Sequence, residues 1–496
     1  MSEGTLRAAD RLQRAALSGA GWNYLASGVT LTAQIGYTAI TARLIAPSGF
    51  GAYATAQAMV SLVGYFTLTT IGAAVMRRSE LSRSLIGSSF VLATAAGCVC
   101  AAFTLAVAGV WARLWHMPDA VNLIRIFAFT VAASTISAVP LAVLRHRLLY
   151  RRAALTESAG QVAGMAIGAV VAIQVRSAIA LPIGQAAAAA VMLGALLFSV
   201  RSDLALCFDR GEIRYLVGFA SQVSGQNLVF YAINTAPAWF VARVFNGSVL
   251  GLYSRANVLV MLPGTHVSLG LTKALYPLYA RVHADAPAAR RLLTKTIATA
   301  TGVVWPAFAA LGGAALVATD LLLGPTWTGV ATLLPPLAVF GCVSLPLIVL
   351  FNAAEAFRWM KHTWSLQLVW LAALAAVMAT SLAAQASLRT MLWETAAVQA
   401  GVHLGQILVF ARRGYLSAVG VVTAYAVNAS AAALAYVSAK QAEQGLGQTP
   451  AALQALAVAA VVVAVVAARL AIGRALAHRT DAPAPPIRPI GAESSL

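Results

Sequence analysis

The stretch ARLIAPSGFGAY at residues 42–53 occurs a second time, in altered form, as ARVFNGSVLGLY at residues 242–253. When the chain is shifted by 200 residues, nine of the 23 positions from 42 to 64 match without a gap. The most specific part is an arginine, a glycine eight residues later and a tyrosine ten residues later. This repeat indicates two similar halves, and structural roles at the turns are predicted for Arg43, Gly51, Tyr53, Arg243, Gly251 and Tyr253.

Long apolar segments surround both copies of the repeat. Of the 496 residues, 60% are apolar and 10% are charged, whereas soluble domains are usually about 45–50% apolar and about 25% charged. This composition excludes a soluble enzyme, a nucleic-acid-binding domain and a disordered chain. It predicts an all-α integral membrane protein, because the ten-residue alternation of a membrane β-barrel does not occur in the sequence.

A helix that crosses a membrane needs about 20 mainly apolar residues. Fourteen such segments are present, at residues 19–44, 50–76, 85–112, 120–144, 153–175, 178–200, 215–243, 247–279, 293–319, 328–354, 363–386, 389–411, 415–438 and 450–476. Each half holds six of them, so both halves enter the membrane in the same orientation, as a parallel repeat. The predicted parts are a basic interfacial segment (1–18), two six-helix lobes (19–200 and 201–411), two additional helices (412–478) and a disordered proline-rich tail (479–496).

The basic residues give an orientation to these segments. The chain carries a net charge of +19. If the N-terminus is cytoplasmic, 24 Lys and Arg residues fall in inner segments and 6 in outer segments. This bias follows the positive-inside rule, so both termini are predicted to be cytoplasmic in a multi-pass protein. One missed span would disturb the alternation, so the bias also supports the count.

Four cations remain in or at the edge of the predicted spans, and three of them are candidates for binding a cargo. A cation near the bilayer centre costs roughly 2.5–3.5 kcal/mol, so such residues usually face a cavity or extend to the interface. No Asp or Glu occurs in the first two spans. Cations without nearby acids favour an anionic cargo, because guanidinium and ammonium groups pair with phosphate. The three candidates are Arg125, Arg255 and Lys273.

Uncharged polar residues are frequent in the first and seventh spans. They can bind sugar hydroxyls, or they can hold neighbouring helices together. The candidates among them for substrate binding are Asn23, Gln226, Asn227 and Asn234. A proline in a spanning helix frees a carbonyl group and allows a bend. The predicted hinges in the second half are Pro237, Pro263 and Pro277.

Sequence motifs of enzymes and metal sites are missing from the chain. It holds no HExxH, GxSxG or Walker loop, and its four cysteines form no CxxC pair. We therefore expect a transporter and not an enzyme, with no cofactor, no bound metal and no nucleic-acid partner.

The opening stretch resembles the "ARLLxPxxFGxY" turn of polysaccharide repeat-unit flippases in the multidrug/oligosaccharidyl-lipid/polysaccharide exporter superfamily. Residues 251–256, with Leu262-Pro263 and residues 275–277, are similar to the "GLYSRA…LP…LFP" run of that family. Residues 287–291 resemble its "DDPxxLRR" loop, and residues 324–327 its "LGxxW" turn. The resemblance covers roughly residues 15–440 and is closest to the exopolysaccharide branch. One departure is that Ser48 and Gly49 stand where the family usually has an acidic residue.

The resemblance implies a function, which we take as an expectation. It implies flipping of undecaprenyl-pyrophosphate-linked oligosaccharide repeat units across the bacterial inner membrane, for exopolysaccharide or O-antigen synthesis. The two lobes would alternate access to a cationic cavity. The implied partners are the polyprenyl-pyrophosphate-linked oligosaccharide, membrane lipid, and a polysaccharide polymerase and co-polymerase.

Three alternatives stay open at this point. One is a flippase for the lipid precursor of peptidoglycan. Another is a cation-coupled multidrug exporter, which the missing carboxylate in the first lobe and the two additional helices disfavour. The third is a membrane scaffold of the polysaccharide assembly machinery that transports nothing itself.

Overall fold

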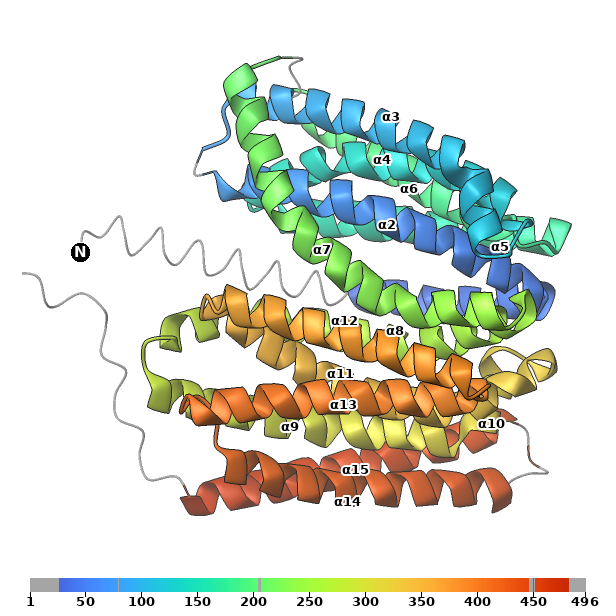
Figure 1. Ribbon diagram of the computed structural model, residues 1–496, viewed down its shortest axis with the longest axis vertical. Helices are drawn as coiled ribbons and strands as arrows, with labels where there is room; N and C mark the ends of the chain where they lie inside the picture. The colour runs from blue at the N-terminus through green and yellow to red at the C-terminus, as the bar shows by residue number, and fades with distance from the viewer. Residues whose placement is uncertain (1–25, 79, 204–206, 446–448, 450, 481–496) are drawn as a thin grey trace, which may run out of the picture.

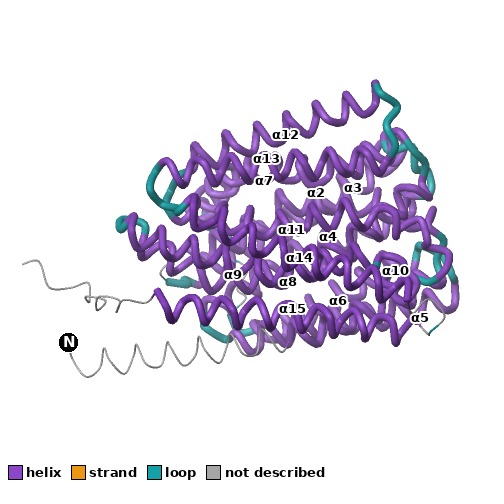
Figure 2. The backbone as a smooth tube through the Cα atoms, turned by 90° about the horizontal axis from the view of Figure 1, so that it is seen from below, coloured by secondary structure: helices purple, strands orange, loops and turns teal. Residues whose placement is uncertain are grey.

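The computed structural model describes residues 26–480, apart from residues 79, 204–206, 446–448 and 450. Inside helices, it leaves out the side chains of residues 66–70, 220–224, 226, 262–274, 277, 451–452, 461, 468 and 470–480. The basic segment predicted at 1–18 and nearly all of the predicted tail therefore lie outside the described residues. Figures 1 and 2 show long helices that run side by side in a common direction, joined by short connections.

The described part of the chain is helical, with no strand in the described ranges. The first described helix covers residues 26–44. The others are α2 (Pro47–Arg77), α3 (Arg83–Leu114), α4 (Ala120–His146), α5 (Tyr150–Val175), α6 (Ala180–Val200), α7 (Arg210–Val244), α8 (Gly247–Val282), α9 (Ala286–Gly313), α10 (Ala315–Leu322), η1 (Pro325–Trp327), α11 (Thr328–Ala356), α12 (Met360–Ala383), α13 (Leu388–Arg412), α14 (Ala418–Gly445) and α15 (Ala451–Thr480).

Every predicted apolar segment overlaps a long helix of this set, and the helical membrane fold is confirmed for the described residues. Eight of these helices are long and apolar enough to cross a membrane by length and composition. The number of crossings and the cytoplasmic position of the termini stay predictions. One segment differs: the stretch predicted at 293–319 is divided, because α9 ends at Gly313 and α10 begins at Ala315.

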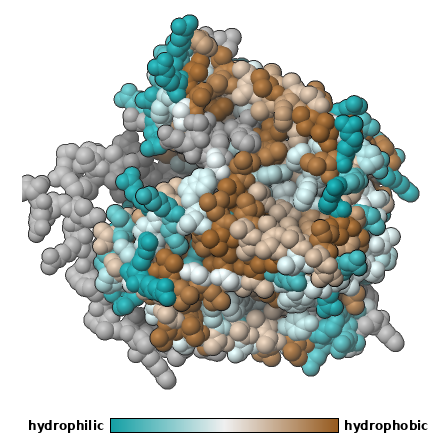
Figure 3. Space-filling model, in the orientation of Figure 1, coloured by the Kyte–Doolittle hydropathy of each residue, from teal (hydrophilic) through white to brown (hydrophobic). Residues whose placement is uncertain are grey.

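Apolar side chains cover much of the outer surface of the bundle. Val99, Phe198 and Val419 are among the large apolar side chains that lie exposed. Figure 3 shows apolar residues gathered across the middle of one face, with hydrophilic residues toward its edges. In water such a surface would be a liability, but in a bilayer it contacts lipid chains, while the polar edges reach the headgroups. The same residues thus explain why the chain has so few charges.

Helix packing follows the same pattern in the two halves of the chain. In the first half, α4 packs against α2, α3 and α6. In the second half, α11 packs against α8, α9 and α13. Each of these central helices is buried along much of its length. The exact limits of the predicted lobes stay a prediction, but the equivalent contacts place α2 beside α4 as they place α8 beside α11.

Helix α7 crosses obliquely from one group of helices to the other (Figure 1). Near its start, Leu216 packs in a cluster with Ala74 and Leu85 of the first half. Further along, Ile233 packs with Trp370 and Leu374 of α12. A change in the position of one half relative to the other would therefore have to bend or reseat α7.

The two additional helices are attached to the second half through polar contacts. On α14, Asn428 donates to the hydroxyl of Thr301 on α9 at 2.7 Å and accepts from Nε of Arg469 on α15 at 2.6 Å. Glu443 of α14 accepts from the backbone N–H of Leu316 at 2.7 Å, at the start of α10. A helix start has free N–H groups and a positive partial charge, so this carboxylate stabilises α10 by about 0.5–2 kcal/mol. It also explains why the apolar stretch can break at Ala314.

Candidate substrate site at the crossing of the two halves

The two repeated glycines lie where the halves come closest. Helices α2 and α8 pack against each other, with their first turns in contact. A Cβ atom built on Gly51 would lie 2.0 Å from the carbonyl oxygen of Gly247, and one built on Gly251 would lie 1.8 Å from that of Pro47. No side chain fits at either place, so glycine is required for this contact of backbone against backbone.

Short-range signals position these first turns. Pro47 begins α2, where a missing N–H costs nothing because that group would have no helical partner. Asn246 caps α8, and its side-chain oxygen accepts from the N–H of Val249 at 3.0 Å. The two starts are thus built from different residues, although the glycines occupy equivalent positions.

The repeated arginines reach across to the opposite half. Arg43 donates through Nη2 to the carbonyl oxygen of Leu321 at 2.7 Å. Arg243 donates through Nη1 to Nε2 of His116, also at 2.7 Å. Leu321 lies in α10 of the second half, and His116 lies between α3 and α4 of the first. Each arginine therefore connects the end of a helix in one half to the other half.

Aromatic residues complete the contact at this end of the bundle. Trp327 is fully buried and donates through Nε1 to the carbonyl oxygen of Ala42 at 2.7 Å. Its ring meets Phe50 edge to face, with 5.2 Å between the centroids. The halves are thus held together where α2 and α8 begin, which is the end that the sequence assigns to the outer side.

Replacing both Arg43 and Arg243 with Ala is expected to lower the amount of folded protein. Hydrogen bonds to charged groups contribute about 1.5–3 kcal/mol when buried and less when exposed, so we expect a loss of about 1–3 kcal/mol for this exposed pair. The measurements are abundance in the membrane fraction and the melting temperature of the purified protein. The control is Ala at Arg113 and Arg389, two exposed arginines elsewhere at the same end. Normal abundance combined with a loss of activity would show that a structural role for the pair is wrong.

Arg255 is the buried cation nearest to this crossing. It lies eight residues after the first residue of α8, about 12 Å along the helix axis. The residue is only 8% exposed, and its guanidinium lies 4.4 Å from the centroid of the Phe50 ring. Its Nη2 is 3.4 Å from the hydroxyl of Ser254, and its Nε has no hydrogen-bond partner. Among the described residues, no carboxylate forms an ion pair with it.

The energetics of this arginine favour a functional role. A buried charge without an ionic partner costs several kcal/mol. The contact with Phe50 offsets about 2 kcal/mol of this cost, as is typical of a desolvated cation–π pair. Because burial of this charge costs more than the contact with Phe50 offsets, we expect that Arg255 is kept for function and not for stability.

Tyrosine hydroxyls of the first half lie near Arg255, and an amide group binds one of them. Tyr37 and Tyr53 lie within electrostatic range of its guanidinium. Gln185 of α6 donates to the hydroxyl of Tyr53 and, at 3.1 Å, to Oε1 of Gln57. Hydrogen-bonding groups of this kind suit sugar hydroxyls or phosphate oxygens as well as they suit one another.

The other predicted substrate residues are dispersed. Arg125 is exposed on α4 and its Nη1 lies 3.4 Å from Oδ1 of Asn122, one turn earlier on the same helix. Asn227 donates to the carbonyl oxygen of Tyr65 at 3.2 Å, and so joins α7 to α2. Asn234 donates to a carbonyl oxygen of its own helix. Asn23 and the side chains of Gln226 and Lys273 lie outside the described residues. The substrate roles of all seven residues, Arg255 included, stay predictions.

The predicted hinges and turns are placed as follows. Pro237 is buried within α7, which remains helical through it. Pro263 and Pro277 lie in the helical backbone of α8, and their side chains are not described. Tyr53 is half-buried against Phe127, with 5.9 Å between the ring centroids, and Tyr253 is buried. Hinge motion at the prolines stays a prediction.

Three residues that make contacts around the crossing were not predicted from the sequence. Phe50 lies inside the opening stretch, Trp327 inside the 324–327 turn, and Gln185 in an alanine-rich helix. Phe50 lies between two glycines and Trp327 lies three residues after Gly324, which is a weak signal for a close contact. Gln185 carries a better signal, because it is an isolated polar residue in an otherwise apolar segment.

This geometry defines a membrane transporter fold of two packed halves. The fold is similar to that of the lipid II flippase MurJ in an inward closed conformation, with a TM-score of 0.74 at 10% identity, covering 92% of this chain and 99% of that one. It is also similar to an inward-facing multidrug resistance transporter of the MATE family in the MOP superfamily. That TM-score is 0.60 at 14% identity, covering 78% and 94% of the two chains. These likenesses show the fold alone.

The chain belongs to the family described as polysaccharide biosynthesis protein, whose pattern its residues 40–332 match. It is 22% identical over 307 residues to the succinoglycan biosynthesis transport protein ExoT of Rhizobium meliloti (strain 1021), over 62% of each chain. It is 20% identical over 334 residues to the lipopolysaccharide biosynthesis protein WzxC of Escherichia coli (strain K12), over 66% of this chain and 68% of that one. The match thus spans less than two thirds of the first relative. The family and the transporter class predicted from the sequence are confirmed.

Proposed function

We propose that this protein flips oligosaccharide repeat units, linked to undecaprenyl pyrophosphate, from the inner to the outer leaflet of the bacterial inner membrane. The units would serve the synthesis of an exopolysaccharide or O-antigen. The two halves would alternate access to a cationic site between them, and both termini would lie in the cytoplasm. A polymerase and co-polymerase would use the units on the outer side.

The observation that carries this proposal is the buried Arg255 without an ionic partner among the described residues. A pyrophosphate group has several oxygens that accept charge-assisted hydrogen bonds from a guanidinium. Because Arg255 is covered by Phe50 of the other half, it becomes available only when the halves separate at this end. That arrangement couples exposure of the cation to movement of the halves.

The carboxylates support an anionic cargo over a cationic one. Two of the three acids that lie within or directly after predicted apolar segments already have partners: Glu157 is 2.8 Å from Nη2 of Arg145, and Glu394 accepts from Ser381 at 2.5 Å. The third, Glu355, is on α11 near its end. A cation-coupled exporter would need an available buried carboxylate, and in the described part of the first half none faces Arg255.

The proposal is tested by reconstituting the purified protein alone in liposomes with a fluorescent lipid-linked oligosaccharide. We expect protein-dependent movement to the other leaflet, measured as access of a sugar-oxidising reagent to the oligosaccharide. Parallel vesicles carry a peptidoglycan lipid precursor or a cationic dye. Movement of the precursor alone or of the dye alone would replace this proposal with the corresponding alternative. No movement of any substrate, with folded protein present, would favour a scaffold.

A further inference from the structure

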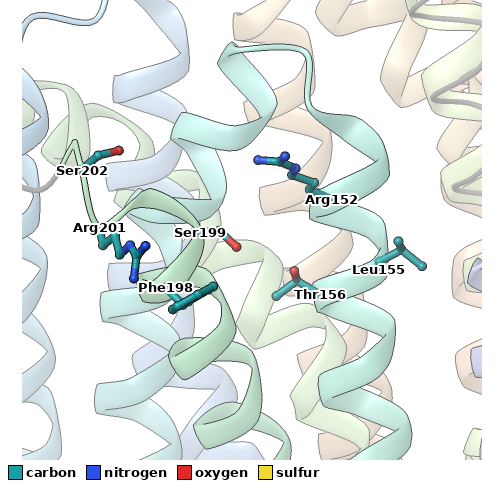
Figure 4. A pocket seen from close by; sticks show the side chains of 7 residues that line it. All are labelled: Arg152, Leu155, Thr156, Phe198, Ser199, Arg201 and Ser202. Carbon is teal, nitrogen blue, oxygen red and sulfur yellow. The ribbon is translucent and has the colours of Figure 1, made fainter.

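A polar pocket lies within the first half, away from the crossing of the two halves. It has a volume of about 540 Å³ and lies between the start of α5 and the end of α6 (Figure 4). Figure 4 shows Arg152 and Thr156 extending from α5 toward the last turns of α6. The lining residues are Arg152, Leu155, Thr156, Phe198, Ser199, Arg201 and Ser202.

The two arginines of this pocket lack ionic partners, whereas the neighbouring arginines have them. Arg147 forms an ion pair with Asp203 at 2.6 Å, and Arg145 forms one with Glu157. Within the described residues, neither Arg152 nor Arg201 makes an ion pair. The guanidinium of Arg201 instead lies 4.7 Å from the centroid of the Phe198 ring. Two guanidiniums beside one cavity attract an anion, and their planar N–H groups match the oxygens of a phosphate.

Hydroxyl groups add donors to the same cavity. Ser199 donates to the carbonyl oxygen of Ala195 at 2.7 Å, which leaves its oxygen free to accept only. The hydroxyls of Thr156 and Ser202 can donate to an anion in the cavity. Two cations and two hydroxyl donors together suit a phosphate group, which is an anion and accepts hydrogen bonds. An uncharged sugar would not need the two cations.

The border of the pocket is apolar on the side of the bilayer. Phe198 is 69% exposed and Leu155 is 46% exposed. Side chains of this kind at the edge of a transmembrane bundle contact acyl chains. The pocket lies at the end of the helices where most of the arginines gather, which is the predicted cytoplasmic end. Basic pockets between helices on that side suit the headgroups of anionic lipids.

We propose that this pocket binds the phosphate of a lipid in the cytoplasmic leaflet, with the acyl or prenyl chain lying along Leu155 and Phe198. The shared chemistry is a phosphate ester on an apolar chain. It has two sources in the membrane, anionic glycerophospholipids and the polyprenyl carrier. The proposal concerns a site in one half and does not depend on which cargo the protein moves.

Lipid binding to the full-length protein by native mass spectrometry tests the proposal. The protein is titrated with phosphatidylglycerol, with undecaprenyl phosphate and, as a zwitterionic comparison, with phosphatidylcholine. We expect Arg152→Gln combined with Arg201→Gln to weaken binding of at least one anionic lipid by about tenfold, the loss expected for removing charge-assisted hydrogen bonds. The anionic lipid that loses affinity identifies the source. The charge-matched control is Arg113→Gln combined with Arg389→Gln, which removes two exposed arginines from the opposite end.

Two outcomes would overturn the proposal. One is equal binding of both anionic lipids by the pocket variant and its control. The other is displacement of the bound lipid by inorganic phosphate at similar concentration, which would make the pocket a site for free anions. If the double variant yields no folded protein, Arg201→Gln alone and Thr156→Val serve in its place, with the same comparison.

Discussion

Alanine at Gly51 or at Gly251 is expected to destabilise the protein and to reduce polymer export by about tenfold or more. The added methyl group would fall 2.0 Å or 1.8 Å from a backbone carbonyl oxygen of the other half. Neither backbone can turn aside as a flexible side chain would, so the halves have to separate. Overpacking of this kind usually costs about 1–3 kcal/mol and sometimes more. The measurements are the melting temperature of the purified protein and the polymer released by cells.

The direction of the change in melting temperature is the test, because replacing glycine with alanine elsewhere in a helix usually raises stability. Alanine is favoured over glycine in a helix interior by about 1 kcal/mol. Gly109 of α3 has no atom within 4 Å of a built Cβ, so Gly109→Ala should keep or raise the melting temperature. If Gly51→Ala and Gly251→Ala also melted at or above the wild-type temperature, the close crossing of α2 and α8 would be wrong.

Methionine at Arg255 is expected to reduce export about tenfold or more while the protein stays folded. Methionine keeps most of the volume over Phe50 but removes the charge. Because the arginine has no ionic partner among the described residues, its removal should leave the melting temperature unchanged or raise it. The measurements are polymer export, melting temperature and abundance in the membrane.

Two further variants separate charge from packing at this position. Arg255→Lys keeps the charge but loses the planar set of donors, so we expect export between that of the wild type and that of Arg255→Met. Arg113→Met removes an exposed arginine and should leave export unchanged. Near-normal export by Arg255→Met would remove the assigned substrate role. A sharp fall in its melting temperature would show that Arg255 acts through packing.

Much of the fold could be predicted from the sequence, because its signals are periodic or local. Apolar segments marked most ends of the long helices to within a few residues, although α9 begins seven residues before its predicted segment. The division at Ala314 could not be predicted in this way. It depends on Glu443, which lies more than a hundred residues further along the chain.

The candidate site was predicted only in part. The repeat singled out Gly51 and Gly251, but a contact between two backbones leaves no side chain to recognise. The repeat also singled out Arg43, yet its partner Leu321 is 278 residues away and offers only a carbonyl oxygen. Counting charges along the chain located Arg255 in a span. It could not show that Phe50 of the other half covers the guanidinium.

The contact at the repeated glycines is one contact made twice. Gly51 faces Gly247 and Gly251 faces Pro47, and the two pairs are related by the same shift of 200 residues. In an oligomer this would be an isologous interface, in which a single surface patch is complementary to itself. The chain is in this respect a dimer whose subunits are joined covalently. The segment between α6 and α7 links them, while the shared patch sets the rotation that relates one to the other.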